Sequence, residues 1–280
     1  MTDSVFRNLP VEWQDWINGN LDRGCDPQDM ARMMGSDSHF TPALTAAAIR
    51  EAVQLRTPLH VLGAPRPTIE TSCNVIHLPD RDVEILLSVA TPRIVLLGNV
   101  LSDAECDALA ALSNPRFVRS AVLDNADGRH QFMDGRTSES ASIARDETEL
   151  VSRVDARLAA LTGWPVQHGE PLQLQKYAPG KEYRPHFDWF DAQHPGLQAS
   201  LAQAGQRLGT VILYLTDVEA GGGTAFPAIG LTVHPKKGSA LFFSNVDTAG
   251  EPDKSTLHAG LPVERGLKIV ANKWLRERAY

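Results

Sequence analysis

His186 and Asp188 form a pair whose residue types and spacing could hold a metal ion. In an extended segment, residues two apart point to the same side, so this imidazole and this carboxylate can bind one ion. His168 and Glu170 form a rival pair of the same kind. For either pair alone, a surface histidine beside a solvated carboxylate is a sufficient explanation, so a third ligand is needed to decide.

His258 is the candidate third ligand, and it precedes Lys268 in an apolar segment. Two histidines and one carboxylate on one face of an ion leave other positions open, which suits ferrous iron that must bind a chelating cosubstrate and O2. A lysine that faces inward beside such a site is costly unless an anion compensates it, and the remote carboxylate of a dicarboxylic acid would do so. The alternative for Lys268 is an edge-strand lysine that points to water.

The stretch from about residue 136 to residue 274 resembles the prolyl 4-hydroxylase-like branch of the iron(II)/2-oxoglutarate dioxygenases. The matching segments, in the order and spacing of that family, are 136–138, 172–188, 206–210, 214–218, 221–227, 235–243 and 258–274. They cover half of the chain. The resemblance favours His186 and Asp188 over the rival pair, and it makes Glu170 a structural or substrate-lining residue.

The resemblance implies that His186, Asp188 and His258 bind Fe(II). It also implies that Lys268 pairs with the far carboxylate of 2-oxoglutarate and that Tyr177 donates a hydrogen bond to the same group, as charge-assisted bonds are strong where water is excluded. The implied reaction uses O2 to hydroxylate an unactivated C–H bond and releases succinate and CO2, and ascorbate is a candidate further cofactor. Because related halogenases lack the carboxylate ligand, its presence favours hydroxylation.

Three further residues match positions that border the substrate or the cosubstrate in the family: Tyr183, Arg207 and Trp274. For Tyr183 and Trp274, packing in the core is an equal alternative. For Arg207 the alternative is a surface ion pair. We therefore expect these residues to line the substrate site, with those alternatives open.

The elements that must hold these residues change in character along the chain. Helical patterns begin near Val11, Pro27 and Pro42, and the proline-rich stretch 58–67 follows them. Later patterns predict helices over 102–112 and 146–162, and strands over 94–97, 172–177, 211–215, 240–243 and 267–270. Helices followed by many short strands indicate an α+β fold. The resemblance makes this fold a double-stranded β-helix (jelly roll) with flanking helices.

Two domains follow from this change: an N-terminal helical region over 1–90 and a dioxygenase domain over 91–280, with a soft boundary between 58–67 and Pro92. The helical region has no counterpart in the catalytic core, so it is a candidate for substrate recognition or for a homodimer interface. The segment 194–205 is an insertion that begins close to the metal pair in sequence, and it is a candidate lid.

Composition limits the possible partners and compartments. The chain has 280 residues, of which 42% are hydrophobic, and a net charge of −7, which argues against binding to nucleic acid or anionic lipid. No segment approaches the roughly 20 apolar residues of a membrane span, and no secretory signal is visible. Three widely spaced cysteines exclude a Cys-type zinc site and favour the cytoplasm.

The expected function is hydroxylation of a prolyl or similar residue in a peptide or protein. One alternative keeps the chemistry and changes the substrate to a free amino acid or small metabolite. Another is a metal-free β-helix that serves as a binding module, which the complete ligand set disfavours.

Overall fold

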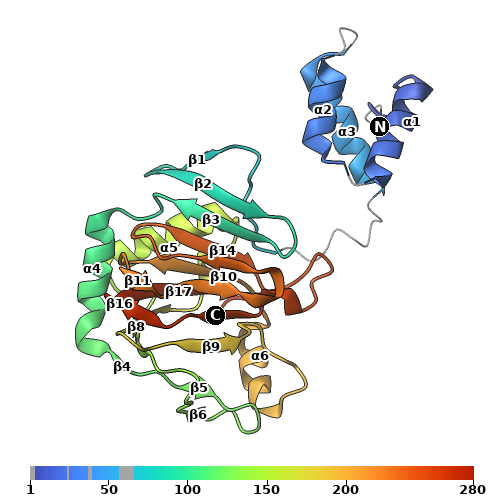
Figure 1. Ribbon diagram of the computed structural model, residues 1–280. Coiled ribbons are helices and arrows are strands. Elements are labelled where there is room, and N and C mark those ends of the chain that lie inside the picture. Colours follow the sequence, from blue (N-terminus) through green and yellow to red (C-terminus); the bar gives the residue numbers. More distant parts are fainter. Residues whose placement is uncertain (1–3, 24, 37–39, 57–65) are drawn as a thin grey trace. The chain divides into compact units, whose positions relative to one another are not determined.

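The computed structural model describes residues 4–23, 25–36, 40–56 and 66–280. The chain divides into two compact units, Met1–Ala64 and Pro65–Tyr280, which Figure 1 shows. Most of the proline-rich stretch expected as a linker lies outside the described residues. The division falls earlier than residue 90, where the sequence placed it, because 75–89 forms two strands that pair with the larger unit's main sheet.

The described residues of the smaller unit form three helices, which begin where the helical patterns predicted. They are α1 Val11–Asp22, α2 Pro27–Gly35 and α3 Pro42–Arg56. The side chain of Asp26 accepts hydrogen bonds from the first backbone amides of α2 and so caps that helix. Ile17, Met30, Met34 and Ile49 are buried together, so Met30 and Met34 belong to the core of this unit, whereas Met33 is exposed.

The larger unit is built on an antiparallel sheet with the strand order β1-β2-β3-β14-β10-β17-β8-β7-β4. The bounds are β1 Val75–His77, β2 Asp82–Val89, β3 Ile94–Gly98, β14 Ala240–Ser244, β10 Arg207–Tyr214, β17 Lys268–Arg276, β8 Leu172–Tyr177, β7 Glu139–Ile143 and β4 Val118–Arg119. Every residue of β17 is buried, as expected of a central strand that is covered on both faces. β17 therefore has other elements packed on both of its faces.

Helices α4 Asp103–Ser113 and α5 Glu149–Thr162 cover one face of this sheet. Ser102 and Glu105 form the capping box that the sequence predicted for α4, and Gly163 ends α5 in the left-handed conformation with φ of 61°. Apolar residues of both helices pack with alternate residues of β8, β10 and β14, including Leu174, Val211 and Phe242. The other face of the sheet is left for the site.

A four-stranded antiparallel sheet in the order β13-β12-β15-β9 faces that second side. Its strands are β9 Tyr183–His186, β12 Thr224–Phe226, β13 Leu231–Val233 and β15 His258–Gly260. Tyr214 and Phe243 of the large sheet pack with Phe226 of the small one in a second core. Two facing antiparallel sheets of this kind form the double-stranded β-helix that was expected.

Smaller elements complete the unit: β5 Val122–Leu123, β6 His130–Gln131, β11 Ala220–Gly221, β16 Val263–Arg265 and α6 Gln198–Ala204. Five short 3-10 turns lie at Asn114–Arg116, Val166–His168, Pro195–Leu197, Pro227–Ile229 and Lys254–Thr256. No helix in the described part of the chain combines the length and the apolar character that a bilayer crossing requires.

Candidate active site

The three predicted metal ligands meet between the two sheets. His186 ends β9 and lies directly opposite His258, the first residue of β15. Asp188 follows β9 by two residues, and the ligand atoms of the three side chains lie within 4.8 Å of one another. The Nε2 atoms of His186 and His258 are 3.8 and 3.7 Å from the nearest carboxylate oxygen of Asp188. Among the described residues this is the one cluster of three or more such groups that could hold a metal ion.

Both imidazoles are held with Nε2 directed at the cluster. Nδ1 of His186 lies 2.9 Å from the backbone oxygen of Arg184, and Nδ1 of His258 lies 3.0 Å from that of Thr256. Because a carbonyl oxygen only accepts, Nδ1 must carry the hydrogen in both rings, which leaves the Nε2 lone pair free for a metal. Burial, together with the neighbouring His258, lowers the pKa of His186 to about 3, so its ring is neutral at pH 7, as a ligand must be.

The carboxylate of Asp188 is ionised. Burial opposes ionisation, but neighbouring positive charge, including the guanidinium group of Arg207, keeps the pKa of Asp188 below its usual range. Two imidazoles and one carboxylate are the donor set of the 2-His-1-carboxylate sites that hold Fe(II). The residues present therefore fit the metal that the sequence implied.

Lys268 meets the expectation of an inward-facing lysine. It begins β17 opposite Tyr177 of β8, and it is only 3% exposed. No hydrogen bond or ion pair connects its ammonium group to any described residue, and burial lowers its pKa to about 8. The alternative of a lysine that points to water is therefore wrong. A buried ammonium group without a partner is costly, and the carboxylate of a bound ligand would remove that cost.

Tyr177 lies beside this lysine, whose Nζ is 5.2 Å from the centre of the phenol ring. The Tyr177 hydroxyl donates to Oε1 of Gln175 at 2.5 Å, and burial raises the pKa of the phenol. Tyr177 is thus protonated and close to Lys268. Its donation to the carboxylate of a cosubstrate stays a prediction.

The three predicted substrate residues all line the cavity that holds the metal cluster. Tyr183 stacks on His186 with 3.5 Å between the ring centres. The guanidinium carbon of Arg207 lies 3.8 Å from the ring centre of Trp274. Arg207 is largely covered, with 16% of its side chain exposed, and it forms two hydrogen bonds of 2.7 and 2.8 Å with Glu170, so its ion pair lies in the wall of the cavity and not on the open surface. The contacts of these residues with a substrate stay predictions.

The rival pair does not form a metal site. The ring of His168 packs edge-on against Trp164, with 5.6 Å between ring centres. Glu170 instead binds Arg207 and Arg276, and it lines the cavity. The structural interpretation of Glu170 is confirmed, because it pairs with the guanidinium groups of Arg207 and Arg276.

Sequence reasoning missed several polar residues around the site. Arg136 is buried, donates to Gln173, and lies 4.8 Å over the ring of Tyr183. Gln175 in turn donates to Gln173. The alternation in 172–177 puts Gln173, Gln175 and Tyr177 on one side of the strand, and this signal was available. The sequence carried no such signal for the partners of Arg136, because they come from segments far apart in the chain.

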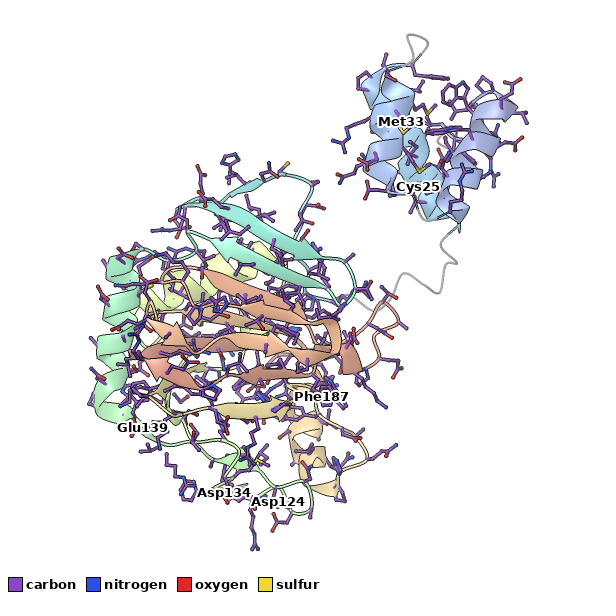
Figure 2. The ribbon with its side chains drawn as sticks, viewed as in Figure 1. Cys25, Met33, Asp124, Asp134, Glu139 and Phe187 are labelled. Carbon is purple, nitrogen blue, oxygen red and sulfur yellow. The ribbon has the colours of Figure 1, made fainter. Side chains whose placement is uncertain are left out.

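The cavity has a volume of about 1550 Å³. The insertion 194–205 contributes His194, Leu197, Ser200 and Gln203 to its lining, and it includes α6 near the metal-binding segment (Figure 1). Asp124 and Asp134, labelled in Figure 2, come from the stretch around β5 and β6 and also line it. The insertion is thus part of the cavity wall, and its opening and closing as a lid stays a prediction.

Comparisons with known proteins show the family of the chain. The family model of the 2OG-Fe(II) oxygenase superfamily matches residues 172–276. The chain is 42% identical to prolyl 4-hydroxylase subunit alpha-1 of Rattus norvegicus over 67% of its length, and 35% identical to probable prolyl 4-hydroxylase 7 of Arabidopsis thaliana over 68%. It spans 35% of the former protein and 64% of the latter.

A solved structure is similar as well. It is the viral collagen prolyl hydroxylase of Paramecium Bursaria Chlorella virus-1 in its 2OG complex. It is 30% identical in sequence, with a TM-score of 0.51, and the match covers 65% of this chain and 95% of the viral one. The chain therefore belongs to the 2OG-Fe(II) oxygenase superfamily, in its prolyl 4-hydroxylase-like branch.

Proposed function

We propose that this protein is an Fe(II)- and 2-oxoglutarate-dependent dioxygenase that hydroxylates a prolyl or similar residue in a peptide or protein. O2 is the second cosubstrate, and succinate and CO2 are released. One observation carries the proposal: a 2-His-1-carboxylate cluster shares its cavity with a buried lysine that has no partner among the described residues. The first needs a metal, and the second needs an anion.

The residues of the chain divide the work between them. Fe(II) with 2-oxoglutarate and O2 supplies the oxidation of the C–H bond. His186, Asp188 and His258 would hold the metal from one side and leave its other side open to the cavity. The ammonium group of Lys268 would neutralise the remote carboxylate of 2-oxoglutarate, which fixes the orientation of the cosubstrate. Asp188, His258 and Lys268 are buried, which strengthens the interaction of each with a bound ligand.

A peptide substrate is supported by two arguments. The relatives named above are prolyl 4-hydroxylases and a collagen prolyl hydroxylase. The cavity volume of about 1550 Å³ exceeds the roughly 300–1,000 Å³ of sites for small ligands, so it leaves room for a segment of chain beside the cosubstrate. The alternative substrate is a free amino acid or small metabolite, and an inert binding module is disfavoured by the complete ligand set.

Three further parts of the proposal rest on the sequence. The protein works in the cytoplasm, as its few cysteines favour. Ascorbate serves as an accessory cofactor. The three-helix unit recognises the substrate or forms a homodimer. Gel filtration of the full chain tests the last point, because a monomer at working concentration would rule out the homodimer.

The central experiment has two stages. Under anaerobic conditions, the protein with Fe(II) and 2-oxoglutarate should develop a visible charge-transfer band, and His186→Ala should abolish it. Mass spectrometry after aerobic incubation with proline-containing peptides should then show the gain of one oxygen on proline, with one succinate per product. No band in the wild-type protein would refute the metal assignment. Oxygen gained only by small metabolites in a cell extract would favour the alternative substrate.

A further inference from the structure

We propose that Thr210 and Asn245 are positioning residues that fix the carboxylate of Asp188 for metal binding. This inference rests on the proposed function. His186 and His258 are held by paired strands, whereas Asp188 follows the end of β9 and lies in neither sheet. Figure 2 shows the neighbouring Phe187 just past that strand end. The place of this third ligand must therefore be set by contacts other than strand pairing.

The backbone around Asp188 is held by the start of β10. The side chain of Gln206 accepts from the backbone N–H of Phe190 and donates to its carbonyl, both at 2.7 Å. Nη1 of Arg207 donates to the backbone oxygen of Asp188 at 3.4 Å. These contacts place the main chain but leave the side chain of Asp188 free to rotate.

Thr210 removes that freedom. Its hydroxyl donates to Oδ2 of Asp188 at 2.8 Å, and Nδ2 of Asn245 lies 3.0 Å from the Thr210 oxygen. An ionised carboxylate only accepts, so the hydroxyl hydrogen must point to Asp188, and the amide of Asn245 must donate to the hydroxyl. Asn245 thus donates to Thr210, and Thr210 donates to Asp188. Each bond also polarises the next one.

The chain of hydrogen bonds is buried and rigid. Thr210 and Asn245 are both 0% exposed. The backbone of Asn245 is itself held, because its N–H donates to Leu208 at 2.9 Å and its carbonyl accepts from Asp253 at 3.0 Å. Oδ2 accepts from Thr210 and lies 3.7 Å from Nε2 of His258, whereas Oδ1 lies 3.8 Å from Nε2 of His186. The hydrogen bond from Thr210 thus sets the rotation of the carboxylate relative to both imidazoles.

The test measures metal affinity without turnover. Partners behind a ligand are typically worth about 10- to 100-fold in metal affinity. In the full chain, Thr210→Val keeps the shape and loses the hydroxyl, so we expect Co(II) binding, followed anaerobically by its visible absorption, to weaken by about 10- to 100-fold. Thr210→Ser keeps the hydroxyl and should restore binding to near the wild-type value. Thr232→Val, on the exposed side of β13, is the matched control and should change nothing.

A second variant keeps the proposal open to refutation if Thr210→Val does not fold. Asn245→Ala leaves the hydroxyl free to turn away from Asp188, so it should weaken Co(II) binding several-fold. Because the two residues act in series, the double variant should bind no more weakly than Thr210→Val. Wild-type affinity in a folded Thr210→Val or Asn245→Ala would overturn the proposal. Failure of the wild-type protein to bind Co(II) or Fe(II) would instead overturn the proposed function.

Discussion

Replacing Lys268 by methionine should weaken 2-oxoglutarate binding and, at the same time, stabilise the ligand-free protein. The two effects have one cause, the burial of a charged group that has no partner among the described residues. A lysine that serves only the fold would show the opposite effect on stability. This combination therefore separates a binding role from a structural one.

The size of both effects can be estimated. Burial lowers the pKa of Lys268 from 10.5 to about 8, which corresponds to about 3 kcal/mol of unfavourable free energy for the protonated form in the folded state. Because the unfolded chain binds this proton more tightly, stability rises with pH between about 8 and 10.5 and the penalty is fully present below pH 8. Methionine removes this penalty, so the net gain in stability is the penalty minus the cost of any imperfect packing of the new side chain. Loss of the ammonium partner of a buried carboxylate costs about 2–5 kcal/mol of binding free energy.

The assay compares two variants by thermal denaturation without ligands and by anaerobic titration of 2-oxoglutarate against the charge-transfer band. Lys268→Met should raise the melting temperature and weaken the binding of 2-oxoglutarate by at least about 30-fold. Lys273→Met is the matched control, because Lys273 lies on the same strand but its Nζ pairs with Asp155 at 2.7 Å. That variant leaves a buried carboxylate unpaired, so it should lose about 3–5 kcal/mol of stability.

The wild-type protein and Lys268→Met should also differ in how 2-oxoglutarate affinity depends on pH. In the wild-type protein, 2-oxoglutarate affinity should be constant below about pH 8 and fall above it, since the free lysine loses its proton there; in Lys268→Met this fall should vanish. Unchanged 2-oxoglutarate affinity in Lys268→Met, or a lower melting temperature than wild type, would refute the reasoning.

Three other outcomes are expected. Mn(II) at 100 times its dissociation constant should add about 2.7 kcal/mol of stability, or roughly 5–10 °C in melting temperature. His258→Ala should lose this shift, and an equal shift in that variant would contradict the ligand assignment. Arg207→Lys cannot reproduce the two hydrogen bonds to Glu170, so the protein should lose about 1–3 kcal/mol of stability by urea denaturation, and the KM for the peptide should rise. Wild-type stability and KM would refute both roles. Burial opposes ionisation of Glu105, but Arg157, the backbone of Ser102 and Arg81 lower its pKa from 4.5 to about 2. The stability that Glu105 contributes above pH 4.5 should therefore be lost as the pH falls towards 2. Acid titration of Glu105→Gln should show a smaller loss of stability, and a profile identical to that of the wild type would contradict this prediction.

Local patterns account for what the sequence predicted well. The capping box at Ser102 and Glu105, the glycine that ends α5 and the alternation in β8 are all decided by residues a few positions apart. The pair His186 and Asp188 belongs to the same class, since its geometry depends on two residues of one extended segment. The resemblance then selected this pair over its rival and added His258 and Lys268.

Contacts between distant segments could not be read in this way. The sequence places 75–89 in the helical region, because the pairing of β1 with β2 and of β2 with β3 is a property of the sheet and not of the local pattern. Arg207 was predicted to be on the surface or at the substrate, and its partner Glu170 lies in a segment 37 positions away. The roles of Thr210 and Asn245 also depend on how β10 and β14 sit behind Asp188.

The sequence by itself determined the kinds of group available, the ends of the main helices and the ligands that share one segment, because spacing along the backbone sets which nearby side chains face the same way. The tertiary structure alone decided which charges are paired. Lys268 and Lys273 lie on one buried strand and look alike in the sequence, yet one faces the cavity with no partner among the described residues and the other binds Asp155. The physical reason is strand register, which sends alternate residues to opposite faces of the sheet and so to different partners.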